Sequence, residues 1–226
     1  MLSLKKNFLF IHIPKTGGNS IQNILSQYYD DLIIIPTDNQ YMMEDFEIKN
    51  KSFPSLSKHS TLMDYRRAIN NDKKMEKIYK FTCVRNPWDR MISLYFYRSA
   101  KRGVFKWSKR DFINMFDKNN GMPNRTCFDY LTTRGGGNLS RLIGNNYKLK
   151  QMLGIKPEVN FIIKFEHLQT DFDNVCKEIG IPKHILPHTN KSRHENYINY
   201  YDDELITLVG EKHRDDIEYF GYKFGV

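Results

Sequence analysis

The sequence predicts an α/β fold: one domain with a central parallel sheet, helices on both faces and a helical or loop-rich insertion over the carboxyl edge of the sheet. Two observations support this prediction. Short apolar segments rich in β-branched and aromatic residues alternate with segments of helical periodicity. The length of 226 residues suffices for one such domain, which we assign to residues 1–226, with a full hydrophobic core.

Four segments carry the strand signal. Each is short and apolar, and turn residues or residues with helical spacing separate it from the next. The predicted strands are Phe8–Ile13, Leu32–Ile35, Tyr79–Val84 and Phe161–Phe165. Because helices are expected between them, the connections favour parallel strands with both faces of the sheet covered.

The helices are predicted from apolar spacing and from capping residues. A buried stripe at positions i, i+3, i+4 and i+7 follows the first strand and consists of Ile21, Ile24, Leu25 and Tyr28. Four further helices are expected: from Ser60 to about Asn70, from Asn86-Pro87 to about Ala100, from Asp171 to Ile179 before Gly180, and from Asp202 to near Gly221.

Residues 101–150 differ from the rest of the chain. This segment is mostly helical and loop-rich, and three consecutive glycines, Gly135-Gly136-Gly137, lie in its middle part. Loops at the carboxyl edge of a parallel sheet are where α/β proteins bind their ligands. We therefore predict an insertion or lid on the side where an acceptor substrate would enter.

Charge and cysteine content narrow the function. The net charge of +9 predicts an anionic partner, but Lys and Arg are scattered and no RNA-binding or zinc-finger spacing occurs, so we do not expect a nucleic acid. Cys83, Cys127 and Cys176 form no pair or ligand motif, so we expect reduced thiols, a cytoplasmic protein and no metal. No apolar run is long enough for a signal peptide or a membrane span, so we expect no integral membrane association.

The first candidate site is the turn after the first predicted strand. The segment Ile13-Pro14-Lys15-Thr16-Gly17-Gly18-Asn19-Ser20 joins that strand to a helix. Its two glycines let the backbone approach a ligand closely, Thr16 and Ser20 offer hydroxyl groups, and Lys15 offers a positive charge. With the positive end of a helix dipole at the same point, this pattern is typical of phosphate binding. The structural alternative is a tight turn with an exposed lysine.

Two common nucleotide-binding motifs do not fit this turn. A Walker A loop needs its lysine directly after the last glycine, whereas Lys15 precedes Gly17 and Gly18. A GxGxxG dinucleotide fingerprint is also absent from the sequence. The pattern therefore disfavours an ordinary ATP or GTP loop and keeps the prediction of an anion site.

The second candidate site follows the third predicted strand. Arg85 stands where that strand ends, and a helix then begins at Asn86-Pro87. Arg90 and Ser93 share the polar face of this helix, opposite an apolar face of Trp88, Met91, Ile92 and Tyr95. The fork of Arg85 and the hydroxyl of Ser93 suit a second phosphate. The alternative is that Arg90 and Ser93 are solvated and that Arg85 pairs with a carboxylate.

Together the two segments resemble the cofactor-binding elements of sulfotransferases that use 3′-phosphoadenosine 5′-phosphosulfate (PAPS). Residues 13–20 are similar to the 5′-phosphosulfate loop of this family. Residues 84–95 are similar to its 3′-phosphate element, in which an Arg and a Ser lie eight positions apart, as Arg85 and Ser93 do. Residues 165–172 and 200–222 further resemble the carbohydrate-type branch of the family. The resemblance is weak over residues 101–150.

The resemblance implies a P-loop-like domain that transfers the sulfuryl group of PAPS to an acceptor hydroxyl on a carbohydrate, releases 3′-phosphoadenosine 5′-phosphate (PAP) and needs no metal. Lys15 is expected to neutralise the leaving phosphate. The expected cofactor-binding residues are Lys15, Thr16, Gly17, Gly18, Asn19, Ser20, Arg85, Ser93, Lys191 and Arg193. The last two lie in a late basic loop, for which a solvated loop is the alternative.

His59 is the candidate general base. It lies just before a predicted helix, between the two phosphate elements, and related carbohydrate-type enzymes carry a catalytic His in a comparable position. A neutral imidazole suits proton abstraction from a hydroxyl. A surface or capping histidine is the alternative, and the rival bases are the carboxylates Glu44, Asp45 and Glu47. His12 alternates within the first strand and is expected in the core.

Two other functions stay open from the sequence. One is a nucleotide kinase or another P-loop-like phosphotransferase, against which the position of Lys15 argues. The other is a noncatalytic module that binds an anionic glycan through the basic surface. The sequence identifies neither the acceptor nor the oligomeric state.

Overall fold

The computed structural model describes residues 1–28, 32–36, 46–50, 52–103, 106–117, 121–132, 143, 146–187 and 194–226, with only the backbone described for 32–36 and 46–50. The chain divides into two compact units. The first comprises Met1–Val84, Tyr130–Arg134 and Pro157–Asn190, and the second comprises Arg85–Asp129, Gly135–Lys156 and Lys191–Val226.

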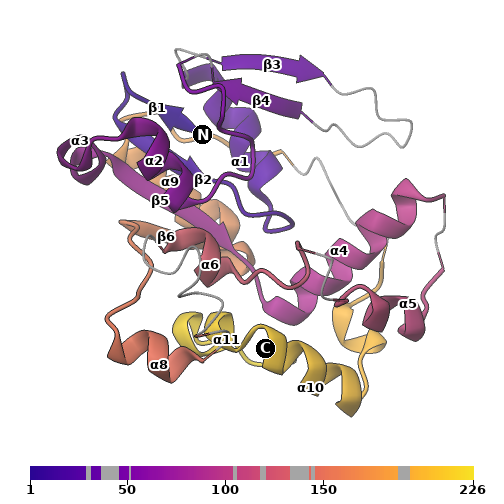
Figure 1. Cartoon of the computed structure of the whole chain (residues 1–226). Helices are drawn as coiled ribbons and strands as arrows, with labels where there is room; N and C mark the ends of the chain where they lie inside the picture. The colour runs from indigo at the N-terminus through magenta and orange to yellow at the C-terminus, as the bar shows by residue number, and fades with distance from the viewer. Residues whose placement is uncertain are drawn as a thin grey trace. The chain divides into compact units, whose positions relative to one another are not determined.

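A four-stranded sheet in the order β1-β2-β5-β6 forms the centre of the first unit (Figure 1). The strands β2 (Phe8–Ile11), β5 (Tyr79–Val84) and β6 (Phe161–Lys164) run parallel. The short strand β1 (Leu2–Ser3) pairs antiparallel with β2. The predicted α/β class with a mostly parallel central sheet is therefore confirmed.

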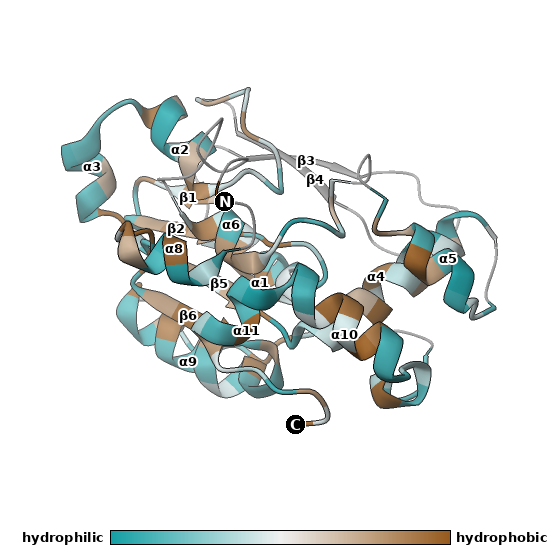
Figure 2. Ribbon diagram, turned by 60° about the horizontal axis from the view of Figure 1, so that its bottom comes forward, coloured by the Kyte–Doolittle hydropathy of each residue, from teal (hydrophilic) through white to brown (hydrophobic). Residues whose placement is uncertain are grey.

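One face of this sheet is covered by α1 (Gly18–Leu25) and α9 (Leu168–Glu178). Alternate strand residues point to this face because side chains alternate along a strand. They pack with both helices in one cluster, which includes Phe8, Phe10, Phe81, Cys83, Ile163, Ile21, Leu25, Phe172, Val175 and Cys176. Figure 2 shows that α9 carries hydrophobic and hydrophilic residues together, as expected of a helix with one buried side.

The opposite face of the sheet carries α2 (Leu62–Ile69) and α3 (Asp72–Lys77). Lys80 of β5 lies on that face, and its Nζ donates to the Met75 carbonyl of α3 over 2.8 Å. The predicted start of α2 was one residue early. The N-cap is Thr61, which forms a capping box with Asp64, whereas the Ser60 hydroxyl accepts from the Ser57 N–H over 2.9 Å.

The predicted strand at Leu32–Ile35 exists, but its expected place in the parallel sheet was wrong. It forms β3 (Leu32–Pro36), which pairs antiparallel with β4 (Phe46–Asn50) in a separate two-stranded sheet. Only residues 37–45 separate the two strands, and a connection of that length suits an antiparallel pair better than a parallel crossover.

Three short 3₁₀ turns complete the local structure: η1 (Ser26–Tyr28), η2 (Phe165–His167) and η3 (Tyr197–Tyr200). The first continues the apolar stripe of α1 to Tyr28. The second takes over directly after β6, so the predicted fourth strand ends one residue earlier than expected.

The second unit is helical where the structure describes it. Its helices are α4 (Pro87–Lys101), α5 (Lys109–Asn114), α6 (Cys127–Leu131, whose last two residues belong to the first unit), α8 (Tyr147–Met152), α10 (Asp203–Lys212) and α11 (Arg214–Phe220). Residues of α4, α5 and α10 share one core cluster, which contains Trp88 as predicted. The predicted insertion at 101–150 is only partly described, and Gly135–Gly137 lie outside the described residues.

The ends of two helices in this unit bear on the predictions. Asn86 caps α4 as predicted, because its side chain accepts from the Trp88 N–H over 3.1 Å. The predicted single helix from Asp202 to Gly221 is wrong. It is divided into α10 and α11 at His213, whose backbone angles (φ −114°, ψ 27°) are not helical. Among the described helices, none combines the length and apolar character needed to cross a membrane.

Candidate anion-binding site

The first candidate site is the loop of residues 13–20, between β2 and α1. Lys15 and Gly17 both have left-handed backbone conformations, with φ of 68° and 85°. Helix α1 starts directly afterwards at Gly18, and no side chain caps its N-terminus. A loop that alternates into the left-handed region before a helix start turns successive N–H groups toward one point. The predicted tight turn into a helix is present, and its backbone geometry suits an anion, whose binding stays a prediction.

Lys15 holds an unfavourable backbone conformation within this loop. A residue with a Cβ in the left-handed region costs roughly 1–2 kcal/mol. Such outliers gather at functional sites, where the surrounding structure maintains them. The half-buried Lys15 thus occupies a position at which the backbone alone would favour glycine.

The two glycines are required for different reasons. Gly17 has a positive φ, and a Cβ placed on it would lie 2.8 Å from Cδ2 of Phe165. Gly18 is helical, but a Cβ on it would overlap the imidazole ring of His12. The sequence predicted that glycines would let the backbone approach a ligand. The structure adds that the protein itself fills the space behind both of them.

Thr16 supports the loop from inside. Its side chain is fully buried, and its hydroxyl donates to the Ile13 carbonyl over 3.0 Å. Its own carbonyl accepts a hydrogen bond from the Cys83 thiol over 2.8 Å. Because the hydroxyl hydrogen is used within the loop, a contact from Thr16 to an anion would come from its backbone N–H and not from the hydroxyl group that the sequence suggested.

His59 contacts His12, the residue directly before this loop. The His59 Nδ1 atom makes a 3.0 Å hydrogen bond with the carbonyl oxygen of His12. Since a carbonyl only accepts, Nδ1 carries the hydrogen, and the neutral His59 ring has its lone pair on Nε2. The two rings meet edge to face, with centroids 4.8 Å apart. The structure therefore brings His59 next to the residue that precedes the loop, with Nε2 as the nitrogen that carries the lone pair in the neutral ring.

His12 itself is a core residue, as predicted, with 3% of its surface exposed. Burial holds the pKa of His12 well below its ordinary value of 6.5, and the nearby charges of His59 and Lys58 lower it further. The contact with Gln22 acts in the opposite direction. His12 is therefore neutral at physiological pH.

The second candidate site belongs to the second unit. Arg85 is 8% exposed, and its Nε donates to Oδ2 of Asp89 over 2.7 Å, so the structure has the pairing with a carboxylate that stood as the alternative to a phosphate contact. Arg90 and Ser93 are buried, so the alternative that they are solvated is wrong. Arg90 donates from Nη1 to the Arg125 carbonyl over 3.2 Å. The bond to Asp89 fixes the plane of the Arg85 guanidinium, which favours forked binding of a phosphate.

Several predicted site residues cannot be placed. Lys191, Arg193, Glu44 and Asp45 lie outside the described residues, and Glu47 lies in β4, of which only the backbone is described. In the part of the chain that the structure describes, no three His, Cys, Asp or Glu side chains gather in a way that could hold a metal ion.

The sequence reasoning missed three supporting residues: Gln22, Cys83 and Asp89. Asp89 had a local signal, because it stands four residues after Arg85 at the start of a helix, where side chains meet. Gln22 and Cys83 had none, because each contacts a residue of a different segment.

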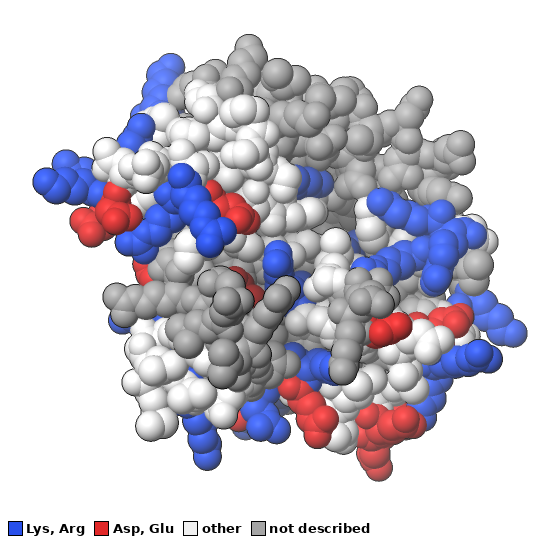
Figure 3. Space-filling model, viewed as in Figure 1, with Lys and Arg blue, Asp and Glu red and all other residues white. Residues whose placement is uncertain are grey.

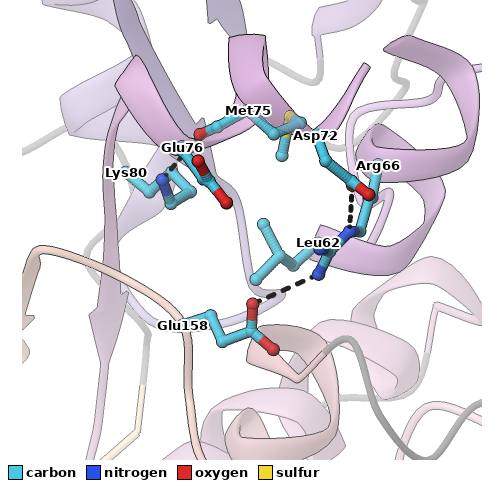
Figure 4. Close-up of a pocket in the computed structure, with 7 residues that line it drawn as sticks. All are labelled: Leu62, Arg66, Asp72, Met75, Glu76, Lys80 and Glu158. Atoms are coloured by element: carbon cyan, nitrogen blue, oxygen red, sulfur yellow. Dashed lines mark hydrogen bonds and ion pairs between the residues drawn. The ribbon is translucent and has the colours of Figure 1, made fainter. Parts of the chain in front are cut away.

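The rest of the described surface indicates an anion site less clearly than these two segments do. Figure 3 shows Lys and Arg side chains spread over the visible face, with smaller groups of Asp and Glu between them. A pocket between α2, α3 and β5 is lined by Leu62, Arg66, Asp72, Met75, Glu76, Lys80 and Glu158 (Figure 4). There Arg66 pairs with Asp72 at 2.8 Å and with Glu158 at 3.3 Å. These ion pairs already balance the charge of Arg66, so the pocket does not suit a phosphate.

Comparison with known proteins gave three results. The model of a family described as the sulfotransferase family matches residues 1–223. An uncharacterized protein of Archaeoglobus fulgidus is 29% identical over 126 residues, which are 55% of this chain and 88% of that protein. Two solved structures are similar. A mouse sulfotransferase, SULT7A1, complexed with PAP has a TM-score of 0.47 and 14% identity over 92% of this chain and 86% of its own. A sulfotransferase from Alicyclobacillus acidocaldarius has a TM-score of 0.39 and 16% identity over 96% of each chain.

Proposed function

Because this chain belongs to the sulfotransferase family, we propose that it transfers the sulfuryl group of PAPS to a hydroxyl group of a carbohydrate and releases PAP. The observation that carries the proposal is the loop of residues 13–20. Its two left-handed residues and the start of α1 form a cradle for the phosphosulfate, and a lysine stands within it.

In the proposed reaction the acceptor oxygen bonds to sulfur while the bond from sulfur to the bridging phosphate oxygen breaks. Negative charge then grows on the leaving phosphate, so catalysis depends on groups that stabilise this charge. We assign that role to the Lys15 ammonium and to the N–H groups from Thr16 to Ser20, with the positive end of α1 behind them.

The acceptor must also lose a proton. We assign this step to Nε2 of His59, the atom that carries the lone pair when Nδ1 donates to the His12 carbonyl. Glu44, Asp45 and Glu47 stay as rival bases. No metal is needed in this scheme, since the lysine and the backbone supply the positive charge.

The 3′-phosphate of PAPS is assigned to Arg85 and Ser93. Support comes from their spacing in the sequence and from the bond to Asp89, which orients the guanidinium group. The late basic residues Lys191 and Arg193 are proposed to contact the same nucleotide. A carbohydrate acceptor is supported by the net charge of +9, which suits a sugar that is already anionic. The three buried, free cysteines favour a cytoplasmic location.

Two measurements test this function. Calorimetry should show that the protein binds PAP and does not bind ATP; the reverse preference would point to a phosphotransferase. Incubation with sulfur-labelled PAPS and a panel of glycans and small phenols should label a glycan. Binding of PAP and of glycans without any transfer would indicate a noncatalytic glycan-binding module and contradict the proposal.

A further inference from the structure

His12 contacts both the helix after the loop and the proposed base. Its Nδ1 lies 2.9 Å from Oε1 of Gln22 in α1, and its ring occupies the space that a Cβ on Gly18 would need. Its carbonyl accepts from Nδ1 of His59, and its ring meets the His59 ring edge to face at an angle of 74°. One residue thus contacts the first two turns of α1 on one side and His59 on the other.

We propose that His12 is a positioning residue, which fixes the His59 imidazole relative to the N-terminus of α1 during sulfuryl transfer. This inference rests on the proposed function, because it takes the start of α1 as the donor site and His59 as the base. His12 itself touches neither the donor nor the acceptor in this scheme. It acts through His59.

Contacts on three sides hold the His12 ring. The ring is buried, and it stacks on Phe10 of β2 with centroids 5.7 Å apart and an angle of 23°. Because the Gln22 oxygen accepts from Nδ1, the Nε2 atom of His12 carries the lone pair, and it faces Gly18 at the positive end of α1. The ring is therefore held from the strand, from the helix and from His59.

A neutral ring suits this task. The charged or titratable groups that face His12 are His59, Lys58 and the amino group of Met1, and each of them opposes a positive charge on His12. A protonated His12 would repel the protonated His59 that forms after proton abstraction. A neutral His12 supplies shape and hydrogen bonds without competing for the anion in the loop.

A double-mutant cycle tests the proposal. Misplacement of a reacting group by about 1 Å costs on the order of 100-fold in rate, so we expect His12→Ala to lower kcat by about that factor while the Kd for PAP changes less than about threefold. In a His59→Ala background, His12→Ala should have no further effect on kcat, because its target is already absent. Effects that multiply in the double variant would overturn the proposal.

Two further variants separate positioning from general destabilisation. Leu9→Ala is the matched control, since Leu9 is a fully buried residue of β2, the strand that ends directly before His12; any effect of Leu9→Ala on kcat should multiply with that of His59→Ala. His12→Asn retains a donor close to the position of Nδ1 and should restore part of the kcat lost in His12→Ala. A His12→Asn variant no better than His12→Ala would show that the contact with Gln22 does not contribute.

Nitrogen NMR of the His59 ring tests the same inference without turnover. The wild-type protein should show the tautomer with hydrogen on Nδ1, held by the backbone carbonyl of residue 12. His12→Ala removes the ring that packs against His59, and Gln22→Leu releases that ring from α1, so both variants should shift or broaden the His59 ring signals. Unchanged His59 signals in both variants would overturn the inference even in an active enzyme. Changed signals in a protein that transfers no sulfuryl group would instead contradict the proposed function and leave the positioning contact intact.

Discussion

Arg85 donates from Nε to Oδ2 of Asp89 over 2.7 Å, so the residue before the N-cap of α4 is bonded to the first turn of that helix. With side-chain exposures of 10% and 18%, the pair is shielded enough from water to hold a fixed geometry. A fixed guanidinium plane presents its remaining N–H groups in one direction. The orientation of Arg85 therefore depends on Asp89.

The fork of Arg85 should matter more than its charge. We expect Arg85→Lys and Arg85→Ala each to weaken PAP binding by about 10- to 100-fold, because hydrogen bonds to a charged group contribute about 1.5–3 kcal/mol and Lys lacks the fork. Calorimetry with PAP measures the effect. Arg102→Lys, at an exposed cation of the same unit, is the matched control and should bind normally. Normal binding by Arg85→Lys would contradict the prediction.

Two substitutions of Lys15 can separate the effect of its ammonium group from the effect of its backbone conformation. Lys15→Ala and Lys15→Gly both remove the ammonium group, and we expect each to lower kcat by about 100- to 1,000-fold with little change in PAP affinity. Only glycine relieves the left-handed conformation, so Lys15→Gly should be more stable than Lys15→Ala by about 1 kcal/mol. Initial rates and thermal unfolding check the two parts. Equal stability of the variants would argue against the positive φ at Lys15.

Gly18 should tolerate no side chain. A Cβ there would overlap His12, so we expect Gly18→Ala to destabilise the protein by about 1–3 kcal/mol in urea unfolding. Gly210 is the matched control, since it is also helical and a Cβ on it would lie at an ordinary 3.7 Å from Cζ2 of Trp88. Gly210→Ala should be neutral or stabilising by about 0.5–1 kcal/mol. Equal effects of the two substitutions would contradict the steric argument.

Asp216 should make the second unit sensitive to acid. Its carboxylate accepts from the N–H groups of Cys127 and Phe128 at the start of α6, both over 2.8 Å. Burial alone would raise the pKa of Asp216, but His213, Arg90 and the Cys127 N–H outweigh burial and lower this pKa below 3.8. The stabilisation is therefore present at neutral pH and is lost as the pH falls through the lowered pKa.

The test compares Asp216→Asn with the wild type across pH. At neutral pH we expect a loss of about 1.5–3 kcal/mol in the free energy of unfolding, because two hydrogen bonds to a charged group are weakened. The difference should narrow below about pH 4, where the carboxylate begins to protonate in the unfolded chain, and should be lost as the pH falls through the lowered pKa of the folded protein. The exposed Asp203, in the first turn of α10, provides the control Asp203→Asn. A gap that stays constant with pH would contradict the assignment.

Local patterns in the sequence were enough to predict most of the helices and strands. The Gly-Gly turn, the Asn86-Pro87 start of α4 and the apolar spacing of α1 each concern neighbouring residues, and the structure has all three. The predicted pairing of the strand at Leu32–Ile35 was wrong, because an apolar segment does not specify which strand it pairs with. The break at His213 was missed because both halves of the segment keep helical spacing.

In the candidate site, too, local patterns were predicted and contacts between distant segments were not. The loop and its lysine were predicted from their order along the chain, whereas the contact of His12 with His59 joins residues 47 positions apart and leaves no local signal. Thr16 was assigned a hydroxyl contact because the sequence does not reveal that Ile13 already accepts that hydrogen. The roles of Lys191, Arg193 and the three rival carboxylates stay predictions, as does the single domain.

The buried thiol of Cys83 provides a natural reporter of the loop. It is completely inaccessible and donates to the Thr16 carbonyl, so a thiol reagent can react with it only after the surrounding structure opens. Its modification rate therefore measures how often this region opens, with the equally buried Cys127 and Cys176 as internal references. A nucleotide that binds the loop should slow the labelling of Cys83 selectively. Occupancy of the site can thus be followed before any acceptor is known.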